Sequence, residues 1–386
     1  MGWVFDIEDP RAARAAWSRI AEPGDREAGA LVQSLGPTGA LRWLIGDARG
    51  RDAGAVAAKH RERWRNRLEG LDPRRELHAL GALGGWLLIP EDEGWPEGLN
   101  DLGAEAPFCL WVRAAEGLAP VLGQRLCPSV SVVGSRASSA YGELVTATMA
   151  GDLAGRGVTI VSGGAFGIDA AAHRAALGAG GLTLAVMAGG VDRLYPLGNE
   201  RLLAAVASEG AVISELPPGA APRRERFLAR NRLIAALGQV TVVTEAAWRS
   251  GAHRTAHVAA ELLRPVAAVP GPVTAAQSAG CHRLIRQGVA TLVTGADEVR
   301  ELMAPLGLVT LEDPVVAKGP LDGLPDSDRQ VLDSLPLRRG ATVTAVVVAS
   351  GLATPQVMAS LGRLERAGRA VQAGGLWRKA RSGGGP

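Results

Sequence analysis

Short apolar runs alternate with longer alanine- and leucine-rich stretches through the centre of the chain. Seven of these runs are rich in β-branched residues and apolar at consecutive positions, as expected of strands buried on both faces. They are residues 129–134, 158–162, 183–189, 211–216, 240–246, 265–271 and 290–294. Because helical stretches fill most of the gaps, the pattern predicts a doubly wound parallel sheet of the α/β class. Ligands of such sheets bind at the carboxyl ends of the strands.

The first 110 residues follow a different pattern, with short helical stretches separated by turns such as EPGD and GPTG. We expect residues 1–110 to form a small N-terminal helical domain. Residues 11–76 hold 14 Lys and Arg against 9 Asp and Glu. This excess fits a solvated helical face. It also fits an accessory DNA-contacting module of the helix-hairpin-helix or SAM-like type, because a positive field attracts a polyanion.

The end of the chain predicts a linker and a third domain. Residues 304–323 are rich in Pro and Gly. Residues 324–386 contain three helical stretches and a hairpin with a Gly-Gly turn, the pattern of a winged helix. Winged helices place a helix in the major groove of DNA or bind proteins. The third helix has only Arg363 and Arg366 as cations, so both roles stay open.

Composition and charge narrow the possible classes of protein. Hydrophobic residues make up 47% of the 386 residues and charged residues 21%, which argues against a disordered chain. Of the 42 basic residues 39 are arginines, in a chain also rich in alanine and glycine, so arginine content alone is weak evidence for phosphate binding. Three distant cysteines without a CxxC pair support neither a zinc knuckle nor a disulfide framework.

We expect a cytoplasmic protein without membrane insertion. The N-terminus is acidic where a signal peptide is basic, and no run of about 18 uncharged apolar residues occurs. Neither GxxxxGK[ST] nor GxGxxG is present, and no residues have metal-ligand spacing. The sequence therefore predicts no cofactor and no metal.

Two loops that follow predicted strands have the features of an anion-binding site. The first, residues 134–136 (Gly-Ser-Arg), precedes a helix whose amides attract negative charge, and Arg136 adds a phosphate fork. An ordinary turn with a surface arginine is the alternative. The second, residues 162–167 (SGGAFG), allows close backbone approach and an anion nest. We expect Asp169 to cap the following helix and His173 to pack inside the fold.

A third loop runs from the strand near residue 187 into a helix that we expect Asn199 to cap. Asp192 and Tyr195 in this loop are candidate ligand contacts, although turn structure alone explains both positions.

A fourth segment, residues 222–232, is strongly basic, and we call it the arginine cluster. It contains five arginines against Glu225, and Phe227 lies within it. The arginines are Arg223, Arg224, Arg226, Arg230 and Arg232. Positive charges oppose the dipole at a helix start, which favours an anionic partner. Cations beside an aromatic ring are typical of single-strand binding, whereas a basic helix start with a core Phe is the alternative.

Six motifs occur in a recognisable order. They are VGSRxxSxYG, SGGAxGIDxxAH, MAGGVDRLYPxxN, SExPPG with FxxRNRLIA, TEA with SGA and TA, and AVPG. Together they closely resemble the DprA (Smf) family of DNA-processing proteins. The resemblance implies an extended Rossmann-like core over residues 111–303 that binds single-stranded DNA and catalyses no reaction. It also implies a homodimer through this central domain and loading of the RecA recombinase during natural transformation.

The resemblance also assigns DNA-contacting residues. In the first two loops these are Gly134, Ser135, Arg136, Ser162, Gly163, Gly164 and Gly167. In the arginine cluster they are Arg224, Phe227, Arg230, Asn231 and Arg232. The family's SGSLxTA is SGAHRTA here, which adds Arg254 as a candidate phosphate contact. The usual FPxRNRxIAGLS is FLARNRLIAALG, with Leu228 for Pro and Ala236 for Gly.

Two further expectations concern assembly and a competing function. Apolar positions near the last predicted strand could supply a dimer face as well as core: Leu284, Ile285, Val289 and Leu292. The competing function is that of a nucleotide N-glycosidic hydrolase of the lysine-decarboxylase-like phosphoribohydrolase type, which has a similar core. Those enzymes carry PGGxGTxxE, and the nearest segment here, VTEAAWRSGAHRTA, has Glu245 but not that motif.

Overall fold

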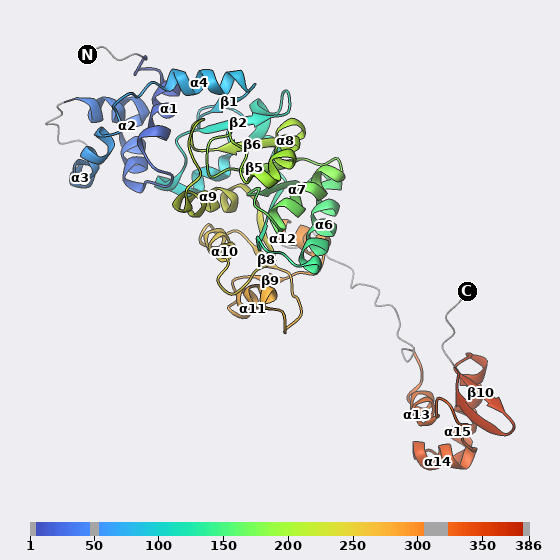
Figure 1. Cartoon of the computed structure of the whole chain (residues 1–386). Helices are drawn as coiled ribbons and strands as arrows, with labels where there is room; N and C mark the ends of the chain where they lie inside the picture. Colours follow the sequence, from blue (N-terminus) through green and yellow to red (C-terminus); the bar gives the residue numbers. More distant parts are fainter. Residues whose placement is uncertain (1–4, 47–53, 305–322, 381–386) are drawn as a thin grey trace. The chain divides into compact units, whose positions relative to one another are not determined.

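The computed structural model describes residues 5–46, 54–304 and 323–380. Their contacts form two compact units, one within residues 1–311 and one within residues 312–386 (Figure 1). The predicted linker 304–323 lies, apart from its two end residues, outside the described residues.

A nine-stranded sheet forms the centre of the first unit, in the order β1-β2-β6-β5-β4-β3-β7-β8-β9. All seven predicted strands are present, and they pair in parallel. They are β3 (Ser129–Gly134), β4 (Thr159–Ser162), β5 (Thr183–Val186), β6 (Ala211–Ser214), β7 (Val240–Glu245), β8 (Val266–Ala268) and β9 (Thr291–Leu292). The predicted α/β class with a parallel sheet is therefore confirmed.

Helices cover both faces of this sheet. They are α6 (Ala140–Gly155), α7 (Ile168–Gly178), α8 (Glu200–Glu209), α9 (Arg224–Leu237), α10 (Ala252–Glu261), α11 (Ala279–Arg286) and α12 (Ala296–Met303). On one face Val130 and Val132 pack with residues of α6, α7 and α12. On the other, Val133 packs with residues of α9, α10 and α11. Successive strand residues point to opposite faces, which is why these strands are apolar throughout.

Two antiparallel strands extend the sheet and were not predicted. β1 (Trp86–Leu88) pairs with β2 (Leu110–Ala114), which pairs with β6. Both are short and carry few β-branched residues, so their pattern is weak. The predicted domain boundary after residue 110 falls at the start of β2, and β1 lies inside the segment predicted to be helical.

The predicted N-terminal helical region is present. It contains α1 (Pro10–Ile20), α2 (Arg26–Ile45), α3 (Gly54–Arg65) and α4 (Pro73–Ala82), which Figure 1 shows in blue at the β1–β2 end of the sheet. Trp17 and Trp64 are fully buried in its core, with ring centroids 5.9 Å apart and edge to face. The Trp111 indole donates to the hydroxyl of Ser18 at 3.2 Å, which ties α1 to β2.

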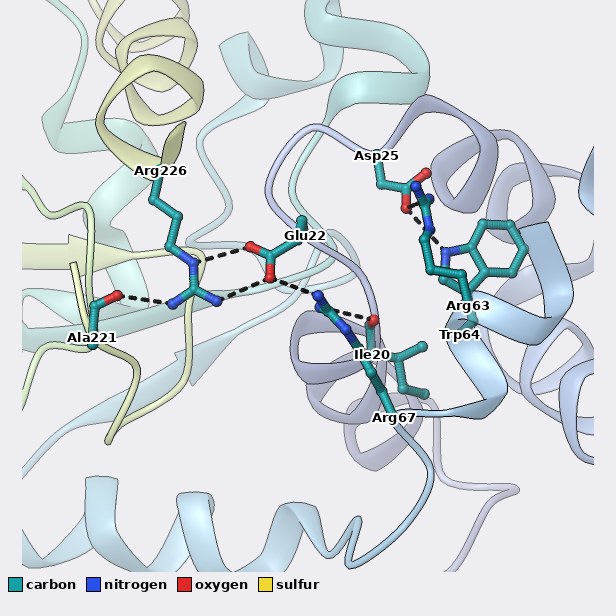
Figure 2. A network of polar contacts seen from close by, with 8 residues as sticks. All are labelled: Ile20, Glu22, Asp25, Arg63, Trp64, Arg67, Ala221 and Arg226. Atoms are coloured by element: carbon teal, nitrogen blue, oxygen red, sulfur yellow. Dashed lines mark hydrogen bonds and ion pairs between the residues drawn. The ribbon is translucent and has the colours of Figure 1, made fainter. Parts of the chain in front are cut away.

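The helical region also contacts the arginine cluster through Glu22. The carboxylate of Glu22 binds Arg226 at 3.0 Å on one side and Arg67 at 2.8 Å on the other (Figure 2). Arg226 donates in addition to the carbonyl of Ala221 at 2.9 Å. The start of α9 is therefore attached to the N-terminal helices.

The second unit has the element order of a winged helix. It consists of α13 (Asp326–Ser334), α14 (Val343–Ser350), α15 (Thr354–Arg366), β10 (Ala370–Ala373) and β11 (Leu376–Lys379). Arg363 on α15 binds the buried Asp328 at 2.6 Å, so this cation is used within the unit. Among the described residues no single helix is long and apolar enough to cross a membrane. The consecutive helices α14 and α15 reach that length and hydropathy only when taken together, and the chain bends by 107° between them.

His173 on α7 packs inside the fold, as expected. Its ring is fully buried, and its Nδ1 lies 2.7 Å from the hydroxyl oxygen of Thr183. Burial lowers the pKa of His173 to about 3, and the positive charge of Arg230 acts in the same direction. The native protein therefore keeps this ring neutral.

We predict that His173 makes the fold sensitive to acid. Between pH 6.5 and 3 the unfolded chain binds a proton at this histidine and the native state does not, so stability falls as the pH is lowered. From pH 7 to pH 5 this one group should remove about 2 kcal/mol from the free energy of unfolding. Denaturant titrations at both pH values should show a smaller loss for His173→Gln. An equal loss in the two proteins would contradict the assignment.

Candidate nucleic-acid interface

The order of the parallel strands reverses between β3 and β7, and a cleft opens at the carboxyl ends of these two strands. We call it the switch-point cleft. Its volume is about 520 Å³, and its walls come from the loops after β3, β4 and β7 and from the start of α9. A crevice at this topological position is where open α/β sheets bind ligands.

Seven of the thirteen residues predicted to contact DNA line this cleft: Gly134, Ser135, Arg136, Arg224, Phe227, Arg230 and Asn231. Arg136 and Arg224 are exposed. The other six do not belong to its lining: Ser162, Gly163, Gly164, Gly167, Arg232 and Arg254. Arg254 is exposed in the first turn of α10.

The loop after β3 rests on the loop after β4. The amide of Ile168 donates to the carbonyl of Ser135 at 3.1 Å. Gly167 has a φ of +74°, and a Cβ atom there would lie 2.3 Å from that same carbonyl oxygen. Only glycine allows this close approach. Gly167 therefore sets the position of Arg136 by letting the two loops pack together.

The loop of residues 162–167 is held by hydrogen bonds from the protein interior. Arg230 donates to the carbonyl of Gly163 at 2.7 Å and also to that of Val186. The side-chain amide of Asn199 donates to the carbonyls of Gly164 and Ala165, both at 3.0 Å. Residues 162–164 are buried, so this part of the loop supports the cleft from below.

Asn199 and Asp169 do not cap the helices as expected. Asn199 precedes α8, but its side chain binds the neighbouring loop instead of the helix amides. Asp169 lies within the first turn of α7, and its Oδ2 accepts from the amide of Ala165 at 3.2 Å. Both expectations relied on local spacing, whereas the partners of these side chains come from tertiary or loop contacts.

A buried charge lies beneath the loop. Arg230 is only 4% exposed, and burial lowers its pKa to about 10, an effect that the carboxylate of Asp169 opposes. Burial raises the pKa of Asp169, and the charge of Arg230 opposes that shift. Arg230 remains protonated at neutral pH and is positioned to organise the loop.

The arginine cluster divides into inward and outward side chains. Arg226 binds Glu22, and Arg232 forms two hydrogen bonds with the buried carboxylate of Glu215, at 2.6 and 2.7 Å. With Arg230, three of the five arginines have internal partners. Arg223 and Arg224 are exposed. The expectation that all five charges indicate an anionic partner is therefore corrected, because most of them stabilise the fold.

Phe227 lines the cleft and is half-buried, so it is not a core residue. The Arg136 guanidinium carbon lies 5.1 Å from the centroid of its ring. The ring of Tyr195, in the loop after β5, lies 5.8 Å away at a tilt of 54°. Cations and aromatic rings are thus brought together from the loops after β3 and β5 and from α9.

The opposite wall contains residues that the sequence interpretation missed. Arg249 and Ser250, in the loop after β7, line the cleft, and Arg249 is exposed. The signal for Arg249 was its place three residues after a predicted strand, in the segment VTEAAWRSGAHRTA. Next to it the half-exposed ring of Trp248 lies under the guanidinium of Arg283, 4.9 Å from its carbon.

Comparison with known proteins decides the family. A sequence model described as DNA recombination-mediator protein A matches residues 86–304. A putative DNA processing protein DprA of Mycobacterium tuberculosis is 43% identical, and the match covers 98% of this chain and 96% of that protein. The chain belongs to the DprA/Smf family. Protein Smf of Escherichia coli is 40% identical over 62% of this chain and 64% of its own length.

Solved structures of DprA proteins share this fold. The X-ray structure of DprA from Streptococcus pneumoniae is 30% identical with a TM-score of 0.58, and the match covers 75% of this chain and 95% of that one. A structure of DNA processing protein A from Helicobacter pylori is 27% identical with a TM-score of 0.50, covering 56% and 94%. That structure is described as showing a single-stranded DNA binding mode. The extended Rossmann-like fold class is confirmed.

Glu245, the carboxylate considered for a hydrolase, is buried and hydrogen-bonded within the fold of this DprA family member. Glu245 is 2% exposed at the end of β7, and its Oε2 accepts from the amide of Ser139 at 2.9 Å. Its backbone carbonyl accepts from the amide of Ser135 at 2.7 Å. Among the described residues no group of three His, Cys, Asp or Glu side chains could hold a metal ion.

We predict that Arg230 and Arg224 differ in their effect on stability. Arg230→Ala removes the donor of two buried carbonyls and should lower the free energy of unfolding by about 3 kcal/mol. Arg224→Ala, its exposed control in the same helix, should change it by no more than about 0.5 kcal/mol. Urea denaturation measures both. If Arg230→Ala were as stable as the control yet bound DNA poorly, Arg230 would have to contact DNA directly.

Proposed function

We propose that this chain binds single-stranded DNA in the switch-point cleft. The observation that carries the proposal is the meeting of exposed Arg136, Arg224 and Arg249 on three walls of one cleft that also holds Phe227. Guanidinium groups bind backbone phosphates, and an aromatic ring among them offers a stacking surface to a base. The single-strand binding described for the Helicobacter pylori relative supports the same function here.

The aromatic rings of the site favour single strands over duplex. A base in a duplex is stacked on both faces and cannot lie against a protein ring, whereas an unpaired base can. Stacking is also tolerant of sequence because every base has a π face. We therefore expect tighter binding to single-stranded than to duplex DNA, with little sequence preference.

We further propose that the protein is not an enzyme and needs no nucleotide or metal to bind DNA. The carboxylate of Glu245 supports the loop after β3, and that of Asp169, in the cleft lining, is only 7% exposed and accepts a hydrogen bond from the backbone amide of Ala165. A hydrolase would need such a carboxylate free to face the sugar or a water. These positions support DNA binding over the N-glycosidic hydrolase considered from the sequence.

We propose in addition that the chain loads the RecA recombinase onto the bound strand. Membership of the DprA/Smf family supports it, since the matching sequence model is described as DNA recombination-mediator protein A. A protein that holds a single strand at an open cleft leaves the rest of that strand accessible to a recombinase.

The salt dependence of binding tests the proposed site. Arg136→Ala, Arg224→Ala and Arg249→Ala should each weaken single-strand binding and lower the slope of log K against log salt by about 0.7, one phosphate contact each. Arg300→Ala, on α12 and outside the cleft lining, is the matched control and should leave the slope unchanged. Fluorescence anisotropy with an oligothymidylate over a range of NaCl gives the slopes. Unchanged slopes in all three cleft variants would place the DNA elsewhere.

We also propose a homodimer through the first unit. Of the four apolar positions considered, Leu284 is fully buried, Ile285 and Val289 pack against the core, and Leu292 is 47% exposed. Leu292 lies on β9, the edge strand of the sheet, whose outer side has no partner strand among the described residues. An exposed edge strand with an apolar residue is suited to pairing with a second chain.

Sedimentation tests this proposal. The protein should be a dimer at micromolar concentration, and Leu292→Asp should shift it toward monomer, because a charge would enter the apolar contact. A wild-type monomer that still binds DNA would contradict the dimer.

A further inference from the structure

Tyr195 is an exposed aromatic residue next to the switch-point cleft. Its side chain is 47% exposed in the loop after β5, and its ring contacts Phe227. The other tyrosine of the chain, Tyr141, is 42% exposed, but its hydroxyl donates to the carbonyl of Pro270 at 2.6 Å. The hydroxyl of Tyr195 has no hydrogen bond to another described residue, so its contact with the fold is made by the ring.

The ring of Phe227 already contacts a cation from the loop after β3. The guanidinium of Arg136 lies over it at 5.1 Å, and Phe227 itself is only partly exposed. Tyr195 is the more exposed ring and contacts Phe227 at 5.8 Å. The three side chains thus form a series, Arg136, Phe227 and Tyr195, whose last member faces solvent.

The loop that carries Tyr195 is held in place at several points. Asp192 accepts from the amide of Gly219 at 2.9 Å, and the amide of Gly190 donates to the carbonyl of Ala220 at 2.9 Å. Asn199, at the other end of the loop, binds the carbonyls of Gly164 and Ala165. A ring presented by a fixed loop loses little conformational entropy when a ligand binds it.

We propose that Tyr195 is a base-stacking residue of the DNA site, and that it forms the outer aromatic surface beside Phe227. This inference rests on the proposed single-strand binding. A base leaving the cleft stacks on the ring of Tyr195, which Phe227 and Arg136 support from behind. Because only an unstacked base can take this position, Tyr195 contributes to the preference for single strands over duplex.

The first experiment compares affinities for single-stranded and duplex DNA of equal length. Tyr195→Ala should weaken single-strand binding about 5- to 150-fold, the range for loss of one stacked base, and leave duplex binding and the salt slope unchanged. Tyr195→Phe should bind like the wild type, because stacking needs the ring and not the hydroxyl. Tyr141→Ala is the matched control, a tyrosine of similar exposure that, unlike Tyr195, has no ring contact with Phe227, and it should retain affinity.

A second experiment uses the wild-type protein and does not depend on any variant folding. Irradiation of the complex with an oligothymidylate containing 5-iododeoxyuridine should crosslink the modified base to Tyr195, as identified by mass spectrometry of the peptides. If the wild type binds no single-stranded DNA, the proposed function itself fails. If it binds and Arg224→Ala weakens it, but Tyr195→Ala keeps full affinity and no crosslink forms at Tyr195, the inference alone is overturned.

Discussion

The geometry of the cleft depends on a guanidinium group inside the protein. Arg230 extends from α9 beneath the loop after β4 and donates to the carbonyls of Gly163 and Val186. These carbonyls come from the carboxyl ends of two neighbouring strands, so one side chain links α9 to the sheet at the point where the cleft opens. Burying an arginine is costly unless its donors are used and a negative charge is near. The two carbonyls and the carboxylate of Asp169 meet that requirement.

This interior network explains why so many predicted contact residues are not on the surface. Ser162, Gly163 and Gly164 are buried because their carbonyls and side chains bind Val132, Arg230 and Asn199. Their glycines allow close packing, which is a different use of glycine from a phosphate nest. Arg224 lies on the same helix as Arg230, and Arg136 lies on the loop that packs against residues 162–167, whereas Arg249 lies on the loop after β7.

The N-terminal helices belong to the same arrangement. Glu22 binds Arg226 at the start of α9, four residues before Arg230, and Arg67 binds the other side of the same carboxylate (Figure 2). These charges lower the pKa of Glu22 despite its partial burial, so the carboxylate is ionised at neutral pH. The N-terminal region therefore contacts the core through the carboxylate of Glu22, and the positive charge of Arg67 is used within that region.

The sequence by itself determined the family, the parallel sheet and the edge of the sheet where the switch-point cleft opens. These properties follow from local features: apolar runs of strand length, the helices between them, and motifs kept in order. It did not determine which member of the arginine cluster faces inward. Arg224 and Arg230 are alike in charge and lie on one helix, yet only the position of α9 against β4 and β5 places one in solvent and the other beneath Gly163. The predictions that Asn199 and Asp169 cap helices failed for the same reason, because the hydrogen-bond partners of both side chains depend on which loops meet. Only the tertiary structure brought Tyr195 to Phe227 and Arg249 to the opposite wall, because these residues lie on the loop after β5, on α9 and on the loop after β7, and chain order alone does not say that these elements meet.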